Sequence, residues 1–152
     1  MRKPRVLFLC VGNACRSIMA EALALHFDRG CFEPLSAGVD PLEYIPPFTL
    51  EALHEAGIST VGLYSKGLSE IRLHRIDYVV DLTEHKVARR MPSSFSGNVI
   101  SYPVRDPFGH DLETFRAARE KLEPFVREEL PGLVCKGNRH WWNWPRRLFK
   151  NG

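Results

Sequence analysis

The chain has 152 residues, of which 44% are apolar and 26% charged, with a formal net charge of +3. This is the length of one ordinary domain, and it suffices to bury about 70% of the unfolded surface, which excludes a stapled mini-protein. The composition is that of a globular chain, and no apolar run approaches the roughly 20 residues of a membrane span.

The N-terminus is basic, like that of a signal peptide, but the apolar run at 6–11 is too short for a signal h-region. The four cysteines are too sparse for a disulfide scaffold, and no C-x-x-C pair suggests zinc. We therefore expect a cytoplasmic protein in which Cys31 and Cys135 are ordinary packed or surface thiols.

Strands and helices alternate along most of the chain. Buried-type apolar runs predict strands at 6–9, 32–36, 76–80 and 99–104. Helical patterns are expected after the first strand, at 47–56, in a short piece capped by Thr83 that stops before Pro92, and at 112–130 with Asp111 as cap and Pro124 as kink. This alternation indicates βαβ crossovers and a four-stranded parallel sheet covered on both faces.

The last segment differs in composition from everything before it. Residues 135–152 contain five Lys or Arg, no acid and all three tryptophans. We therefore divide the chain into an α/β domain at 1–134 and a basic, Trp-rich tail at 135–152. Three hypotheses for the tail stay open: it folds back onto the domain, it binds an anionic partner such as nucleic acid, lipid or an acidic protein, or it is disordered.

The chemically informative segment is 10–17, Cys-Val-Gly-Asn-Ala-Cys-Arg-Ser, where the first strand ends and the first helix begins. In an open α/β sheet, ligands bind at this end of the strands. Gly12 and Asn13 tolerate unusual backbone angles, so the loop can turn its N–H groups inward at a helix N-terminus. Arg16 adds a planar guanidinium suited to two oxygens of a phosphate-like anion.

Cys10 is the predicted nucleophile. A thiol at the rim of an electropositive cradle has a pKa lowered from about 8.5 to roughly 3.5–7.5, so a thiolate would exist at neutral pH. Ser17 is expected to donate a hydrogen bond to it and to cap the helix, while Asn13 braces the loop. The predicted substrate-binding residues in this segment are Val11, Gly12, Asn13, Ala14, Cys15 and Ser17. The alternative for Cys10 is a buried strand-end cysteine.

Cleavage of a phosphate ester also needs an acid that protonates the leaving oxygen, and the candidate is Asp106. It follows the fourth strand at the same sheet edge as Cys10, and a positioned acid contributes roughly 10²- to 10⁴-fold. Phe108 would offer an aromatic wall to a ring-bearing substrate. The alternative for Asp106 is a turn aspartate before proline. The six histidines show no ligand spacing, and His110 is of interest only because it is close to Asp106.

These residues resemble those of the low-molecular-weight protein tyrosine phosphatases and of the arsenate reductases that share their fold. The C-x5-R-S signature is met at 10–17, and Asp106-Pro107 matches the family's late Asp-Pro. Ser36-Ala37-Gly38 and the stretch 52–58 are also similar, so the resemblance covers about 5–133. It implies a flavodoxin-like, single-domain three-layer sandwich with a four-stranded parallel sheet flanked by helices.

The resemblance implies a cysteine-dependent phosphomonoesterase. Cys10 would form a phosphocysteine, Arg16 and the loop amides would bind the phosphoryl group, and Asp106 would act first as acid and then as base. No cofactor and no metal are implied. The expected partners are a phosphotyrosine protein or small aryl phosphate as substrate, and inorganic phosphate or another tetrahedral oxyanion in the loop. Cys15 is similar to the family's second loop cysteine, which traps an oxidised nucleophile as a reversible disulfide.

Three features depart from the family pattern. Leu63 stands where many members carry a His that supports the loop serine. The aromatic pair after Asp-Pro is reduced to Phe108-Gly109, which bears on the preference for phosphotyrosine. The stretch 81–97 lacks the two cysteines of thioredoxin-coupled arsenate reductases. Two alternative functions therefore stay open: an arsenate reductase served by an external thiol or glutaredoxin-like partner, and a non-catalytic phosphate-binding or interaction module.

Overall fold

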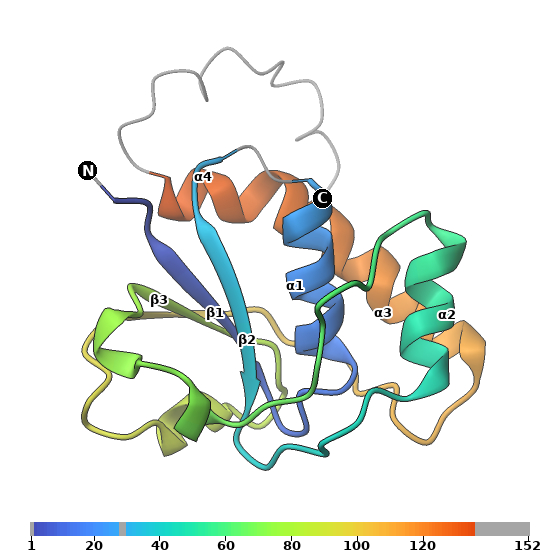
Figure 1. Cartoon of the computed structure of the whole chain (residues 1–152), viewed down its shortest axis with the longest axis horizontal. Coiled ribbons are helices and arrows are strands. Elements are labelled where there is room, and N and C mark those ends of the chain that lie inside the picture. The colour runs from blue at the N-terminus through green and yellow to red at the C-terminus, as the bar shows by residue number, and fades with distance from the viewer. Residues whose placement is uncertain (1, 28–29, 136–152) are drawn as a thin grey trace.

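The structure is a computed structural model that describes residues 2–27 and 30–135 (Figure 1). Four parallel strands form one sheet in the order β2-β1-β3-β4. They are β1 (Arg5–Cys10), β2 (Glu33–Gly38), β3 (Tyr78–Asp81) and β4 (Asn98–Ser101). The predicted sheet is confirmed, but β4 ends at 101 rather than 104, just before Pro103, which has no N–H to donate to a ladder.

The α-helices are α1 (Arg16–His26), α2 (Pro47–Glu55), α3 (Leu112–Pro124) and α4 (Leu130–Val134). Asp111 caps α3 as predicted, because its carboxylate accepts the N–H of Thr114 at 3.1 Å. Pro124 also divides the last helix as predicted, and a π-helical turn, η4 (Phe125–Glu129), separates α3 from α4. The short helix expected after Thr83 is instead a 3₁₀ turn, η3 (Val87–Arg90), preceded by Lys86 at a φ of 54°.

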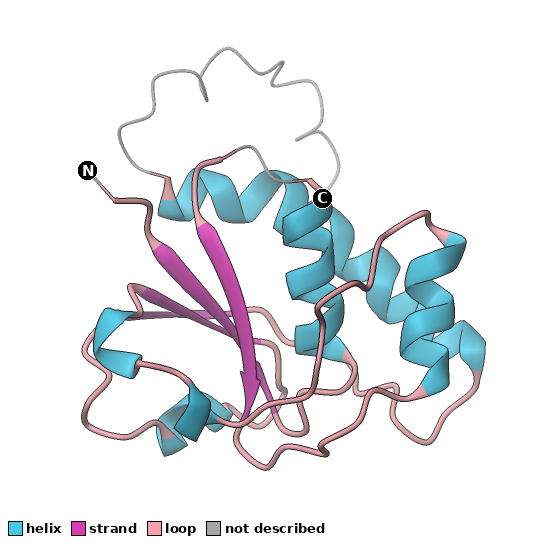
Figure 2. Cartoon of the chain, viewed as in Figure 1, coloured by secondary structure: helices cyan, strands magenta, loops and turns pink. Residues whose placement is uncertain are grey.

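The two faces of the sheet are covered by different kinds of structure (Figure 2). Along β1, Val6 and Phe8 pack into a cluster with α1, α2 and α3, while Leu7 and Leu9 pack into a cluster on the other face. That other face is covered by loops and by η3 together with the 3₁₀ turns η1 (Leu68–Glu70) and η2 (Leu73–Arg75). The predicted three layers are present, with the long helices concentrated in one of them.

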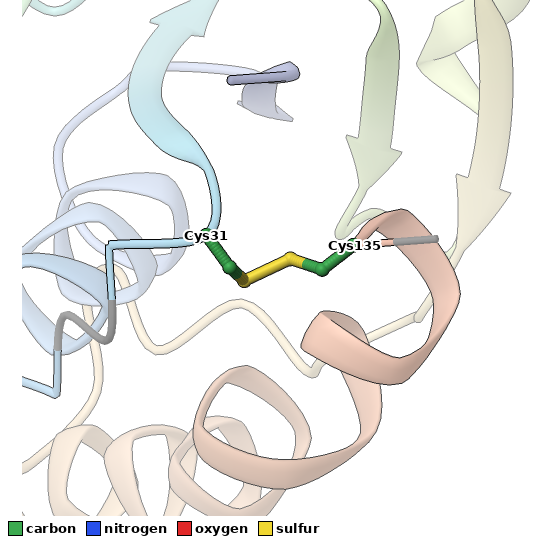
Figure 3. The surroundings of a disulfide bond; sticks show 2 residues. All are labelled: Cys31 and Cys135. Carbon is green, nitrogen blue, oxygen red and sulfur yellow. A yellow bond between two sulfur atoms is a disulfide. The ribbon is translucent and has the colours of Figure 1, made fainter. Parts of the chain in front are cut away.

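A disulfide between Cys31 and Cys135 ties the loop before β2 to the residue after α4 (Figure 3). The prediction of ordinary thiols at these two positions is therefore wrong. The two residues lie 104 positions apart, so no spacing signal links them, and only the packing of α4 beside β2 brings their Cα atoms to 5.7 Å. In the described part of the chain, Cys10 and Cys15 are the free cysteines.

The expectations for the C-terminal tail and for a membrane span concern what the described residues include. Of the predicted tail at 135–152, all but Cys135 lies outside them, and so do the three hypotheses for the tail, including the possible anionic partner. Among the helices that are described, none has the length and apolar character needed to cross a membrane.

Candidate active site

The segment 10–17 connects the end of β1 to the start of α1, and a second segment lies along its outer side. We call residues 39–43, which follow β2, the rim segment. Its backbone N–H groups donate to three successive carbonyls of the loop: Val39 to Cys10 at 3.2 Å, Asp40 to Val11 at 2.9 Å, and Leu42 to Gly12 at 2.9 Å. The rim segment therefore holds the outer face of the loop in one position.

These bonds also set the direction of the loop's N–H groups. In a trans peptide the C=O and the following N–H point in opposite directions, and the described chain contains no cis peptide. With the carbonyls turned outward, the N–H groups of Val11, Gly12 and Asn13 face the other side, and they donate to no backbone acceptor among the described residues. Such a set of convergent donors is an anion-binding nest.

Of the two loop residues expected to tolerate unusual backbone angles, one has a left-handed backbone. Asn13 has a φ of 46°, whereas Gly12 is not in the positive-φ region. A non-glycine residue held there requires support from its surroundings. Asn13 has that support because it is fully buried and both ends of its side-chain amide are hydrogen-bonded.

Asn13 belongs to a chain of hydrogen bonds that ends at Cys10. The backbone N–H of Lys66 donates to Oδ1 of Asn13 at 2.8 Å, and Nδ2 of Asn13 donates to Oγ of Ser17 at 2.7 Å. Oγ of Ser17 lies 2.9 Å from Sγ of Cys10. A backbone N–H can only donate, so it fixes the orientation of the Asn13 amide, and the hydroxyl proton of Ser17 is left to point at sulfur. Sulfur is therefore placed as an acceptor.

The sequence had predicted two roles for Ser17, of which the structure supports one. Its hydroxyl contacts Cys10 as expected. The prediction that Ser17 caps α1 is wrong, because the N-cap residue is Cys15 and no side-chain hydrogen bond caps the helix. The hydroxyl of Ser17 is instead engaged by Asn13 and Cys10.

Lys66, rather than Leu63, supports this network through its backbone N–H. Leu63 packs against the core, half-buried. The Lys66 side chain is 8% exposed and lies 3.5 Å from the carboxylate of Glu21 in α1. Its Nζ also donates to Oγ of Ser36 at 3.2 Å, and Ser36 donates to Glu21 at 2.5 Å. We call Glu21, Ser36 and Lys66 the Lys66 cluster.

Sequence reasoning missed the Lys66 cluster because a lysine in a loop is usually a surface residue. One signal was available. Glu21 is a charged residue in the middle of α1, where residues 16–20 and 22–24 are all buried. A carboxylate in such a position needs a partner, since an unpaired buried charge is costly.

Arg16 and Asp106 meet at the mouth of the loop. Arg16 is only 5% exposed, and its Nη1 donates to the carbonyl of Val104 at 3.1 Å. Its Nη2 lies 3.5 Å from Oδ2 of Asp106, whose side chain is 52% exposed. Oδ1 of Asp106 accepts the N–H of Phe108 at 3.0 Å. The guanidinium is thus fixed by the chain that follows β4, which also carries the carboxylate.

These groups line one pocket of about 210 Å³. The lining residues are Cys10, Val11, Gly12, Ala14, Cys15, Arg16, Asp40, Leu42, Asp106 and Phe108. Of the predicted site residues, only Asn13 and Ser17 are absent from that lining, because both are fully buried beneath the loop. Asp40 and Leu42 of the rim segment were not predicted, and His110 does not line the pocket.

Cys15 also lines the pocket, but its thiol differs from the predicted nucleophile in that it keeps its proton. It is buried, and burial is the largest influence on it, raising the pKa of the Cys15 thiol to about 12. Cys15 is therefore protonated at neutral pH.

Comparisons with known proteins extend over most of the chain. A family model described as low molecular weight phosphotyrosine protein phosphatase matches residues 5–138. An arsenate reductase of Bacillus cereus (strain G9842) is 28% identical over 125 residues, which is 82% of this chain and 92% of that protein.

Two solved structures are similar in fold and in sequence. One is a mutant of the YwlE arginine phosphatase with a phosphorylated active-site serine, at a TM-score of 0.76 and 27% identity, covering 89% of this chain and 98% of that one. The other is an arsenate reductase in the phosphate-binding state, at a TM-score of 0.74 and 27% identity, covering 86% and 98%. Phosphoryl transfer and arsenate reduction thus both occur among the proteins that this chain resembles.

Proposed function

Because the chain belongs to the low molecular weight phosphotyrosine protein phosphatase family, we propose that its substrates are phosphotyrosine proteins or small aryl phosphates. The chain is a cysteine-dependent phosphomonoesterase of this family's type, which acts through a phosphocysteine intermediate. As an enzyme, it is not the non-catalytic binding module that the sequence left open. The observation that carries the assignment of residues is the hydrogen-bond chain that places Sγ of Cys10 as an acceptor beneath the nest of N–H groups.

In the proposed first step, Sγ of Cys10 attacks phosphorus. The S–P bond forms as the bond from phosphorus to the leaving oxygen breaks, and Asp106 gives its proton to that oxygen. Arg16 and the loop N–H groups hold the non-bridging oxygens, where negative charge increases in the transition state. The products are the free alcohol or phenol and phosphocysteine.

In the proposed second step, the Asp106 carboxylate takes a proton from water, whose oxygen attacks phosphorus. The P–S bond breaks, the electron pair returns to Cys10, and inorganic phosphate leaves. The half-exposed position of Asp106 suits this role because water reaches its carboxylate. The phosphate-binding state of the similar arsenate reductase supports the proposal that the loop holds a tetrahedral oxyanion.

Phosphotyrosine is favoured by the walls of the pocket. Leu42 and Phe108 are apolar residues of the lining, and Phe108 is 47% exposed, so a phenyl ring can pack beside it. Phe108 is the aromatic residue of this lining, and Gly109, which follows it, has no side chain to add to it. We therefore propose that the enzyme also accepts small aryl phosphates that lack a peptide.

Arsenate reduction is the second candidate, and the name of the Bacillus cereus relative favours it. Arsenate and phosphate have nearly the same shape, so the nest does not distinguish them. To reduce an arsenate adduct on Cys10, an external thiol would attack Sγ of Cys10, which releases arsenite and leaves a mixed disulfide. A second external thiol, such as that of a glutaredoxin-like partner, would then regenerate Cys10. Cys31 and Cys135 do not supply these thiols, because they are joined to each other.

The deciding experiment compares p-nitrophenyl phosphate hydrolysis with thiol-dependent arsenate reduction in wild type, Cys10→Ser and Asp106→Asn. We expect wild-type hydrolysis, a loss of at least about 10³-fold in Cys10→Ser, a loss of about 10²-fold or more in Asp106→Asn, and no arsenate reduction. Arsenate reduction that Cys10→Ser abolishes and Asp106→Asn leaves intact would instead assign the reductase activity.

The cytoplasmic location expected from the sequence stays a prediction. The disulfide between Cys31 and Cys135 is an observation against it, since disulfides are rare in reducing compartments. Rapid alkylation of intact cells followed by mass spectrometry of these two cysteines tests it. Carbamidomethylated thiols at both positions are expected in a reducing compartment.

A further inference from the structure

Asp40 places an uncompensated negative charge at the mouth of the pocket. Its backbone N–H donates to the carbonyl of Val11, so its position relative to the phosphate loop is set by the backbone. Its side chain lines the pocket and is exposed. Within the described residues its carboxylate forms no hydrogen bond or ion pair.

The other charges of the lining are already matched. Arg16 and Asp106 lie 3.5 Å apart. In the proposed function Arg16 also binds the phosphoryl oxygens. Asp40 is the one remaining ionisable carboxylate among the residues that line the pocket. It cannot help to hold a phosphoryl dianion, since like charges repel. Its charge is therefore available only to the organic part of the substrate, and the rim segment carries it into the lining of the pocket.

We propose that Asp40 selects substrates that carry a positive charge next to the phosphorylated side chain, such as phosphotyrosine peptides with a neighbouring Lys or Arg. This inference rests on the proposed function and deepens it. An ammonium or guanidinium group reaching the rim is attracted to Asp40, whereas an acidic neighbour is repelled. For unit charges about 6 Å apart and an effective dielectric constant of about 40 to 80, each effect amounts to roughly 3- to 10-fold in binding.

The rigid attachment of the rim segment strengthens this selection. Leu42 donates its N–H to Gly12, and Ser65 contributes a second bond to the same carbonyl at 3.0 Å. The hydroxyl of Ser65 in turn accepts the N–H of Glu43 at 3.1 Å. A carboxylate carried by a segment fixed on both sides loses little conformational freedom when a cation binds.

The test measures kcat/KM for two phosphotyrosine peptides that are identical except for Lys or Glu on both sides of the phosphotyrosine. Wild type, Asp40→Asn and Asp40→Lys are compared at low ionic strength. Glu51→Gln is the matched control, because it removes the same charge from an exposed residue of α2 that does not line the pocket. Turnover of p-nitrophenyl phosphate is measured for all four proteins.

We expect wild type and Glu51→Gln to prefer the Lys peptide by about 10-fold or more, since attraction and repulsion combine. In Asp40→Asn both effects are lost, so the ratio should fall by about 10-fold towards one, and in Asp40→Lys it should fall below one. Added salt should reduce the wild-type ratio. A ratio that stays within twofold of wild type in both Asp40 variants overturns the inference. Turnover of p-nitrophenyl phosphate by wild type without turnover of either peptide would also overturn the inference. Absence of turnover of both peptides and of p-nitrophenyl phosphate would instead overturn the proposed function.

Discussion

A single methyl group at Gly38 is expected to damage the active site from outside it. Gly38 ends β2, and a Cβ built there would lie 2.4 Å from the carbonyl oxygen of Val11 and 2.7 Å from the backbone nitrogen of Asn13. Real Cβ contacts shorter than 3.0 Å essentially do not occur. Both atoms belong to the backbone of the phosphate loop, so no side-chain rotation relieves the contact. In Gly38→Ala the loop must therefore move by about 0.6 Å, the difference between 2.4 and 3.0 Å.

The magnitude follows from how sensitive catalysis is to position. A misplacement of about 1 Å costs about 10²-fold in rate, so a shift of about 0.6 Å is expected to cost about 10-fold or more. That corresponds to about 1.4 to 2.7 kcal/mol of lost transition-state stabilisation for a 10- to 100-fold effect. The assay is kcat/KM for p-nitrophenyl phosphate, with the inhibition constant of inorganic phosphate as a second readout. The kcat/KM should fall and the inhibition constant should rise, because the displaced N–H groups bind the substrate and the product alike.

Gly132→Ala is the matched control. This glycine lies in α4, a Cβ there meets nothing within 4 Å, and its backbone is not in the positive-φ region. It should retain kcat/KM within about twofold, and alanine favours the helix. The reasoning is refuted if Gly38→Ala folds like wild type by circular dichroism and also keeps its kcat/KM within twofold.

Three further predictions concern stability and thiol chemistry. Lys66→Met should lower the free energy of unfolding in urea by about 3 kcal/mol, because the largely buried carboxylate of Glu21 loses its cation. Lys66→Met/Glu21→Gln should recover part of the loss. Equal stability of Lys66→Met and wild type would contradict this prediction. At pH 8, Cys15 should react with iodoacetamide about 10³-fold more slowly than a thiol of pKa 9.0, as followed by mass spectrometry. The contribution of Cys15 to the stability of the fold should be lost as the pH rises from 9 towards 12, since the unfolded chain releases the thiol proton first. Rapid labelling of folded protein at Cys15 would refute this. Reduction of the Cys31–Cys135 bond should lower the free energy of unfolding by about 2–5 kcal/mol, as measured by thermal unfolding with and without dithiothreitol. Cys31→Ser should show the same loss, and dithiothreitol should not lower its stability further.

The amino-acid sequence was sufficient to predict the parts of the site that are contiguous or follow from the sheet. The loop at 10–17 is one uninterrupted segment, so its nucleophile and its Arg16 are read together. Asp106 was placed at the same edge because the carboxyl ends of parallel strands share one edge of a sheet, and the ion pair between Arg16 and Asp106 agrees with that placement. The cap at Asp111 and the break at Pro124 were likewise predictable, because both depend on local backbone chemistry.

Other features were decided only by the tertiary structure, because they depend on which distant segments become neighbours. The rim segment holds the loop through backbone N–H groups, which nearly every residue has, so nothing in residues 39–43 marks them as different from any other loop. Asp40 enters the pocket through that same contact. Lys66 becomes a buried residue because α1 supplies a carboxylate beside it, and Cys31 meets Cys135 across 104 residues because α4 ends next to the start of β2. The sequence by itself thus predicted the chemical groups of the loop. The packing of the chain decided which residues support the loop and which residues of other segments line the pocket, since burial and long-range contacts exist only in the folded molecule.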